Sequence, residues 1–287
     1  MAADPGPAPA AAPPLRQFAP AKLNLYLHLT GRRADGYHQL DSLVVFAGIG
    51  DSVAVRAAED LRLTLGGPFA DGLRQERDNL VLRAARALAQ AAGRPAAAAI
   101  RLDKHLPVAS GIGGGSADAA ASLRALAVLW QLDLDEEALD RVALSLGADV
   151  PACLRSRPLQ MAGIGERLMP VDGLPRLDLV LVNPGLGLAT REVFAAFDGD
   201  FTAAAPFAAM PKTVAALAAA LRQRRNDLEA PAIRLCPEIG AVIAALAARP
   251  GCLLARMSGS GATCFGLFES PAAARDAAAA LAAQQPL

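Results

Sequence analysis

The sequence of 287 residues is poor in lysine, histidine, cysteine and aromatic residues, and it carries no net charge. Lys and Arg together number 28, as do Asp and Glu, so the chain has no overall field that would attract a nucleic acid or an anionic membrane. We therefore expect no nucleic acid and no membrane as partner, and an anionic ligand would need a local site. The scarce lysines, each a compact charge, are Lys22, Lys104 and Lys212.

The few cysteines and histidines form no metal-binding pattern. There is no Cys-x-x-Cys pair, and no spacing fits zinc among Cys153, Cys236, Cys252, Cys264, His28, His38 and His105. We expect buried free thiols in a reducing cytoplasm and no metal cage built by the protein.

Long apolar runs are absent as well. No stretch reaches about 18 uninterrupted apolar residues, which excludes a typical membrane-spanning helix. The first residues are rich in Pro and Ala and lack the charged start and apolar centre of a secretory signal. We therefore predict a disordered tail over residues 1–17.

An alternating pattern from Phe18 to Leu29 predicts a half-buried strand. Leucines occupy one face, and the other face carries Lys22, Asn24, Tyr26 and His28. The segment after this strand contains an Asp-Gly pair, which is typical of a turn.

Strand and helix patterns then mix without regular alternation. Strands are predicted at 43–49, 52–57, 61–65, 98–102 and 176–185, and on both sides of a glycine turn within 252–268. Helices are predicted from an Asp78 N-cap to Ala92, over 116–130, 135–146 and 190–197, in the Ala-rich stretches that follow, and last in the chain. The mixture favours an α+β fold over a doubly wound sheet, with one domain over 18–158 and another over 159–287.

A glycine-rich stretch before the helix at 116–130 predicts a phosphate cradle. Glycines let the backbone amides approach a ligand, and a helix N-terminus favours an anion. The pattern is neither the P-loop nor the dinucleotide fingerprint. Helix capping or tight packing would also explain the glycines, and Ser116 would serve equally as an N-cap or as a phosphate or metal contact. The candidate phosphate-binding residues are Pro107, Val108, Ala109, Ser110, Gly111, Ile112, Gly113, Gly114, Gly115, Ser116 and Ala117.

Three segments in order resemble the GHMP kinase superfamily: PAKLNLYLHLTGRRADGYHQL, PVASGIGGGSADAA followed by LGADVP, and RMSGSGATCF. The first segment resembles the branch that phosphorylates a cytidine diphosphate-linked methylerythritol in the non-mevalonate isoprenoid pathway. The resemblance implies an N-terminal α/β domain like that of a ribosomal protein and a C-terminal ferredoxin-like domain. It also implies ATP and Mg²⁺ as cofactors and the cytidine compound as substrate.

The phosphate loop departs from the superfamily pattern at a few positions. Ala109 and Ser110 replace glycines, and Ala117 and Asp118 stand where Ser and Asn are usual. Loss of the second hydroxyl removes one phosphate or metal contact. We expect the negative charge of Asp118 to point along the helix or toward magnesium.

The resemblance assigns Asp149 as the catalytic base and Lys22 as the second catalytic residue, which would keep Asp149 ionised. Asn24 is expected to hydrogen-bond the substrate near its reacting end. From local sequence alone, an Asp at this position more often caps a short helix, and a lysine on a strand is more often a solvated charge.

The cytidine site is assigned to Tyr37, His38, Thr190 and Phe194. A pyrimidine ring needs an aromatic side chain on which to stack and hydrogen bonds at its edge. Tyr37 and Phe194 would supply the stacking rings, and His38 would hydrogen-bond the edge. Phe194 would also suit a hydrophobic core. Lys104 would meet the substrate diphosphate or be solvated, and the turn at 259–261 would support the phosphate loop, border the diphosphate or simply close a hairpin.

Other functions stay open at this point. A related kinase acting on mevalonate, homoserine or a sugar would share the phosphate loop but not the Gly-Tyr-His segment. An RNA-binding module and a relative without catalysis are further alternatives; the balanced charge disfavours the first. Ser116 is the best candidate magnesium ligand, and we expect a monomer or weak homodimer.

Overall fold

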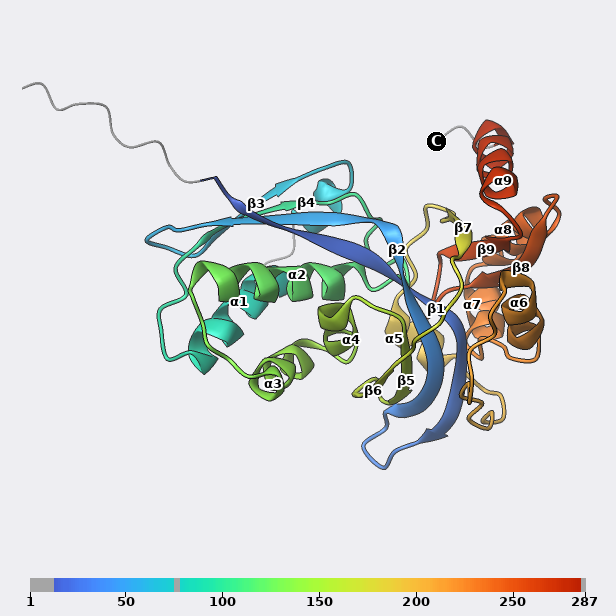
Figure 1. The fold of residues 1–287 in the computed structure, drawn as a ribbon, viewed down its shortest axis with the longest axis horizontal. Helices are drawn as coiled ribbons and strands as arrows, with labels where there is room; N and C mark the ends of the chain where they lie inside the picture. The colour runs from blue at the N-terminus through green and yellow to red at the C-terminus, as the bar shows by residue number, and fades with distance from the viewer. Residues whose placement is uncertain (1–12, 75–77, 285–287) are drawn as a thin grey trace, which may run out of the picture.

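The computed structural model describes residues 13–74 and 78–284. It contains a six-stranded sheet covered by helices and, toward the other end of the molecule, a three-stranded sheet with its own helices (Figure 1). Strands and helices mix, so the predicted α+β class is confirmed. Within the described residues no helix is long and apolar enough to cross a membrane.

Two long antiparallel strands run through the larger sheet. They are β1, Leu15–Arg32, and β2, His38–Arg56. The two short strands expected at 43–49 and 52–57 are therefore one continuous strand. Gly50 lets the strands stay together, because a Cβ on this residue would lie 2.2 Å from the carbonyl oxygen of Ala19.

The other strands extend the sheet on both sides of β2. The order is β3 (Arg62–Gly66), β4 (Ala99–Asp103), β2, β5 (Leu159–Gly163) and β6 (Arg167–Pro170), with β1 also pairing with β2. Only β3 and β4 are parallel among the described strands, which excludes the doubly wound alternative.

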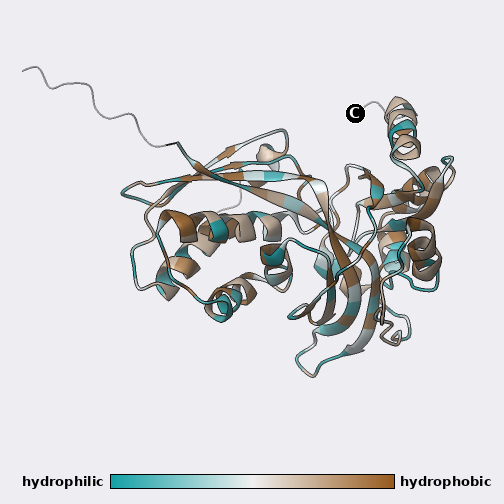
Figure 2. Ribbon diagram, in the orientation of Figure 1, coloured by the Kyte–Doolittle hydropathy of each residue, from teal (hydrophilic) through white to brown (hydrophobic). Residues whose placement is uncertain are grey.

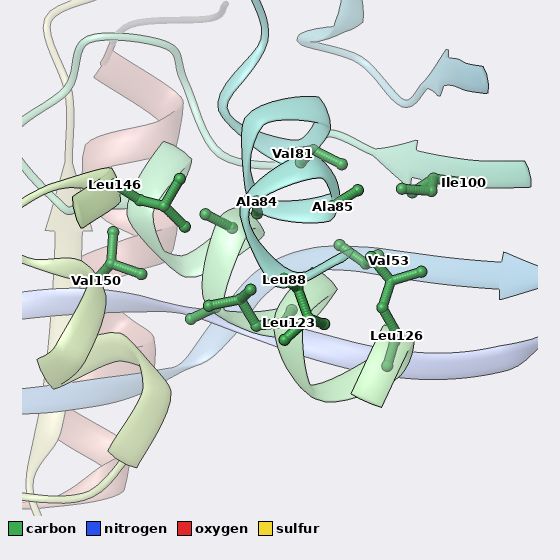
Figure 3. Close-up of a cluster of buried hydrophobic side chains, with 14 of the residues drawn as sticks. Val53, Val81, Ala84, Ala85, Leu88, Ile100, Leu123, Leu126, Leu146 and Val150 are labelled. Atoms are coloured by element: carbon green, nitrogen blue, oxygen red, sulfur yellow. The ribbon is translucent and has the colours of Figure 1, made fainter. Parts of the chain in front are cut away.

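Four helices pack below this sheet in the view of Figure 1: α1 (Leu80–Ala91), α2 (Gly114–Leu129), α3 (Glu136–Leu146) and α4 (Val150–Arg155). Figure 3 shows Leu88 of α1 beside Leu123 of α2, and Val53 of the sheet beside Leu126 of the same helix. A short 3₁₀ helix spans Ala70–Leu73. The predicted N-cap of α1 was wrong by one residue: Asn79, not Asp78, accepts the amide proton of Val81.

The smaller sheet has the order β7 (Asp178–Val182), β9 (Cys264–Phe268) and β8 (Cys252–Met257), all antiparallel. Its region also holds α5 (Thr190–Ala195), α6 (Val214–Arg222), α7 (Glu229–Leu235), α8 (Glu238–Ala247) and α9 (Pro271–Gln284). Figure 2 shows apolar residues along the strands and helices and hydrophilic residues at the hairpin between β1 and β2.

The predicted domain division at residue 158 stays a prediction. In the structure, β5 and β6 follow that residue and still belong to the larger sheet. Strand β1 begins at Leu15, so residues 15–17 of the expected tail form its first part, while residues 1–12 of that tail lie outside the described residues. The cysteines are free thiols as expected, although Cys252 is only partly buried.

Strand β1 is not half-buried as predicted, because its polar face is buried too. The segments after β7 cover that face. His28 shows how: its Nδ1 lies 3.0 Å from the carbonyl oxygen of Ala203, and its Nε2 accepts the amide proton of Arg225 at 3.2 Å. The buried polar side chains are thus satisfied by a second layer of chain that the alternating pattern does not reveal.

Arg256 of β8 joins the two sheets. Its guanidinium is buried and donates to the carbonyl oxygens of Leu25 (2.8 Å), Leu221 (3.1 Å) and Arg224 (2.7 Å). Removing it would leave three backbone acceptors without this donor inside the protein, and each such acceptor costs free energy.

Replacing Arg256 with Met should lower the free energy of unfolding by about 2–4 kcal/mol, measured by urea denaturation. The matched control is Arg222→Met, since Arg222 is exposed and donates to one carbonyl, that of Leu253. We expect the control to change the free energy by about 0.5 kcal/mol or less. Equal effects of the two replacements would contradict the role given to Arg256.

Candidate functional site

A cleft of about 810 Å³ lies where β1, the loop before α2, the start of α4, α5 and the turn between β8 and β9 meet. Nearly all the predicted site residues line it. They are Lys22, Asn24, Tyr37, His38, Pro107, Val108, Ala109, Ser110, Gly111, Gly113, Gly114, Gly115, Ser116, Asp149, Thr190 and Phe194. Ile112 and Ala117, also predicted, are buried behind the loop.

Lys22 and Asp149 form an ion pair in the cleft, 127 residues apart in sequence, with Nζ 2.6 Å from Oδ1. The side chain of Lys22 is 4% exposed, so it is not a solvated charge, whereas that of Asp149 is 37% exposed. Asp149 does hold the N-cap position of α4, but among the described residues its carboxylate makes no capping bond. The pair can therefore present one carboxylate oxygen to a ligand.

The ion pair touches the glycine loop directly. The amide of Lys22 donates to the carbonyl oxygen of Ile112 at 2.9 Å. Gly113 packs against the lysine side chain, where an added Cβ would lie 3.2 Å from its Cβ. The loop and the pair are thus parts of one wall of the cleft.

Helix α2 begins at the end of this loop, and the residues of its first turn line the cleft. Gly113, with φ of 62°, is its N-cap, so Ser116 lies inside the first turn and is not the cap. Within the described part of the chain the Ser116 side chain makes no hydrogen bond, which leaves its hydroxyl to a ligand. Free amides and a helix dipole together suit an anion.

The turn between β8 and β9 supports the loop from behind. A Cβ on Gly111 would lie 2.4 Å from the carbonyl oxygen of Gly261, and Thr263 donates its amide to the carbonyl of Ser110 at 3.1 Å. Residues 259–261 were expected to support the phosphate loop, to border the diphosphate or only to close a hairpin, and these contacts favour the first role. Ser260 of the same turn meets Thr190, with the two hydroxyl oxygens 2.9 Å apart.

A buried charge cluster lies beneath the loop. Lys104 donates to Asp51 at 2.5 Å and to Asp118 at 2.7 Å, and it sits below Gly114, whose added Cβ would be 3.1 Å from Nζ. Asp51 also accepts the amides of His105 and Leu106. The expectation of a solvated Lys104 is wrong, because Lys104 is buried, and Asp118 points to Lys104 rather than along the helix. A contact of Lys104 with the substrate diphosphate, or of Asp118 with magnesium, stays a prediction.

The cluster changes the pKa values of its members. Burial is the largest cause, and it raises the pKa of Asp118 to about 7 although the Lys104 ammonium acts in the opposite direction. Burial disfavours the charged form of Lys104, but the two carboxylates outweigh it and raise its pKa. One oxygen of Asp118, Oδ1, is buried without a hydrogen-bond partner among the described residues.

The residues predicted for the cytidine site gather at the other end of the cleft. Tyr37 is 62% exposed, and the rings of His38 and Phe194 have centroids 5.3 Å apart. Phe194 is half-buried. It lines the cleft and also packs against a hydrophobic core cluster that includes residues of the smaller sheet, so it lies both at the predicted site and against a core. Burial, and then the charge of Arg32, lower the pKa of His38, which keeps its ring neutral.

Sequence reasoning missed several residues here. Phe197 and Phe201 also surround His38, with ring centroids 6.0 and 6.3 Å away. Ser42 and Asp51 lie in β2, just outside the two strands predicted at 43–49 and 52–57, and nothing local marks them. Only the fold shows which side chains they meet.

Family models agree with this geometry. The model for the GHMP kinases N terminal domain matches residues 79–157, and the model for the GHMP kinases C terminal matches residues 208–287. The fold predicted from the superfamily resemblance is thereby confirmed.

Curated relatives are similar over nearly the whole chain. A 4-diphosphocytidyl-2-C-methyl-D-erythritol kinase of Paramagnetospirillum magneticum is 57% identical over 268 residues, covering 93% of this chain and 94% of the relative. One of the same name from Granulibacter bethesdensis is 56% identical over 270 residues, covering 93% and 89%.

Solved structures agree in fold. A 4-(cytidine 5′-diphospho)-2C-methyl-D-erythritol kinase is 39% identical with a TM-score of 0.76, covering 93% of this chain and 95% of that one. A homoserine kinase from Cytophaga hutchinsonii is 17% identical with a TM-score of 0.70, covering 96% and 92%, and shows the shared fold alone. Because both domain models match and the similarity to these relatives spans both, the chain belongs to the 4-diphosphocytidyl-2-C-methyl-D-erythritol kinase family of the GHMP kinases.

Proposed function

We propose that this protein transfers the γ-phosphoryl group of ATP to a hydroxyl of 4-diphosphocytidyl-2-C-methyl-D-erythritol, a step of the non-mevalonate isoprenoid pathway. The observation that carries the proposal is the contact between the Lys22–Asp149 pair and the glycine loop in one cleft. Phosphoryl transfer depends mainly on positioning and charge stabilisation, and this arrangement supplies both.

The loop is the proposed ATP side of the cleft. The amides of residues 113–116 would bind the triphosphate, and the α2 dipole would add favourable potential. Apolar side chains beside the loop would cover the purine; they are Leu73, Leu80, Val81 and Val108.

The residues present fit a magnesium ion that arrives with ATP. The described residues hold no group of three or more His, Cys, Asp or Glu side chains that could bind a metal, and Mg²⁺ is normally held by substrate phosphates, water and one or two protein oxygens. The hydroxyl of Ser116, which lines the cleft, would be its protein ligand. When bound, the ion would offset negative charge on the phosphate oxygens.

Asp149 and Lys22 are the proposed catalytic residues. Asp149 would accept the proton of the acceptor hydroxyl while the bond from that oxygen to the γ-phosphorus forms and the bond from the γ-phosphorus to the leaving ADP breaks. The Lys22 ammonium, 2.6 Å from Asp149, would keep that carboxylate ionised and offset the charge on the transferred group.

The cytidine end of the substrate would lie near Tyr37, His38 and Phe194, with Thr190 beside them. The exposed Tyr37 ring can stack on the pyrimidine, and the neutral His38 can bond its edge through a ring nitrogen. Asn24 follows Lys22 by two residues in β1, also lines the cleft, and would meet the erythritol portion.

Asp118 makes ATP binding dependent on pH in this proposal. The cluster of Lys104, Asp51 and Asp118 is neutral when Asp118 carries a proton and has one net negative charge when it does not. Ionised Asp118 would repel the triphosphate through the first turn of α2.

We further propose that the protein works in the cytoplasm as a monomer or weak homodimer. The free thiols of the described residues support a reducing compartment. Size-exclusion chromatography with light scattering measures the oligomeric state.

The substrate is tested by ADP release with a panel of acceptors. We expect ADP formation with the cytidine compound, dependent on magnesium, and none above background with mevalonate, homoserine or galactose. The last three represent the alternative of another GHMP-type kinase, which the fold shared with homoserine kinase makes worth testing. Turnover of one of them in place of the cytidine compound would overturn the proposal.

Replacing Asp149 with Asn should lower kcat by about 10²–10⁴, because the amide cannot accept the proton, while both substrates bind with nearly unchanged affinity. Steady-state kinetics and titration calorimetry measure these effects. Asp140→Asn is the matched control: Asp140 is also partly exposed and pairs with one cation, Arg155, outside the cleft. An active Asp149→Asn enzyme would remove Asp149 from the role of base.

Replacing Tyr37 with Ala should raise KM for the cytidine substrate about 10-fold or more, because the cytosine ring loses the aromatic side chain on which it stacks. KM for ATP should stay within about twofold, because the adenine ring does not contact Tyr37 in this proposal. Phe18→Ala, which removes another half-exposed ring far from the cleft lining, serves as control. A change confined to ATP would show that the cytidine site is misplaced.

Replacing Asp118 with Asn should strengthen ATP binding at pH 8 by about three- to tenfold and change it little at pH 6. The sign follows from the pKa of about 7: wild-type Asp118 is mostly protonated at pH 6 and mostly ionised at pH 8. Titration calorimetry of both proteins at pH 6 and pH 8 gives the ratio of the ATP affinity of the variant to that of the wild type at each pH. Asp103→Asn, at a carboxylate paired with Arg101, is the control, and a ratio that does not vary with pH would contradict the role of Asp118.

A further inference from the structure

The side-chain amide of Asn24 lies in the wall of the cleft with one atom unsatisfied. Its Nδ2 donates to the hydroxyl oxygen of Ser42 at 2.8 Å. Its Oδ1 is buried and has no hydrogen-bond partner among the described residues. Lys22 lies two residues earlier in the same strand and also lines the cleft.

Ser42 fixes which way this amide faces. Its hydroxyl oxygen is 2.5 Å from the carbonyl oxygen of Tyr26, and a carbonyl can only accept, so the single hydroxyl proton of Ser42 is donated there. Ser42 can then only accept from Asn24, which must present its NH₂ group. With the amide rotated by 180°, two oxygens would face each other with no proton between them.

The surrounding strands hold both residues in place. Ser42 is fully buried in β2, opposite Leu27 of β1 and Met161 of β5. A bulge in β1 between Asn24 and Tyr26 brings both residues to Ser42. The backbone amide of Asn24 donates to Ser258 at 3.1 Å, so Asn24 is held at its main chain as well.

We propose that Ser42 is a positioning residue that, by fixing the amide of Asn24, leaves the cleft an oxygen that accepts only, and so selects an acceptor substrate with a hydroxyl proton to donate there. The inference rests on the proposed function, because it concerns the hydroxyl-bearing part of that substrate. A buried acceptor without a donor is costly, and a donor from the substrate recovers that cost. Sites of this kind discriminate strongly against analogues that lack the donor.

The kinetic test compares Ser42→Ala with Ser42→Thr. The alanine variant should lower kcat/KM for the acceptor about 5- to 20-fold and leave KM for ATP within about twofold, because only the amide of Asn24 is released. The threonine variant keeps the hydroxyl and should stay within about twofold of wild type. If Ser42 acts through Asn24, adding Ser42→Ala to Asn24→Ala should lower kcat/KM no further.

Ser122→Ala is the matched control. Ser122 is fully buried, and its hydroxyl also donates to a backbone carbonyl, that of Asp118 at 2.8 Å, but it does not line the cleft. The kcat/KM of the Ser122→Ala enzyme for the acceptor should stay within about twofold of the wild-type value. The inference is overturned by an unaffected Ser42→Ala enzyme, by a Ser42→Thr enzyme as slow as Ser42→Ala, by an equal loss in the control, or by a further loss in the double variant.

Amide exchange measured by NMR separates this inference from the proposed function. The side-chain NH₂ signals of Asn24 are identified by their loss in Asn24→Ala. They should exchange with solvent about tenfold or more faster in Ser42→Ala than in the wild type, since the bond to Ser42 protects them. Equal exchange overturns the inference even if the wild type turns over another acceptor, and faster exchange supports it in that case too.

Discussion

The site depends on the position of one strand residue, Lys22. Its backbone amide donates a hydrogen bond to Ile112 in the loop that precedes α2, and its side chain packs against Gly113. Its ammonium pairs with Asp149 at the start of α4. Three segments that are distant in sequence are thereby fixed around one point of the cleft. Because β1 is buried on both faces and tied to the smaller sheet through Arg256, that point is held by the whole fold.

Charge balance beneath the loop is the second constraint. A glycine cradle that binds phosphate needs positive potential, and this chain places Lys104 directly below it but gives that lysine two carboxylate partners. The ammonium therefore serves mainly to keep Asp51 and Asp118 buried and so to fix the loop to β2. Breaking such a buried pair is costly, which makes the cluster a structural foundation for the loop.

The sequence predicts the fold class, most element positions and the residues that line the cleft, because glycine spacing, period-two patterns and helix signals are local. It does not predict what buries the polar face of β1 around His28, since the covering segments follow more than 170 residues later. The partners of Lys104, the Ser42–Asn24 bond and the ring contacts of His38 with Phe197 and Phe201 were missed because they depend on tertiary packing, even where the partners are near in sequence. Asp149 shows both cases. Its N-cap position at α4 can be predicted from the local sequence, but its ion pair with Lys22 depends on the tertiary fold.

We propose that the amides at the start of α2 hold the triphosphate while Asp149 receives the acceptor hydroxyl. A crystal structure with a non-hydrolysable ATP analogue and the cytidine substrate tests it most directly. We predict phosphate oxygens on the amides of residues 113–116 and the acceptor oxygen within about 3.2 Å of the Asp149 carboxylate, in line with the γ-phosphorus. A triphosphate bound away from that loop, or an acceptor oxygen out of reach of Asp149, would contradict the account.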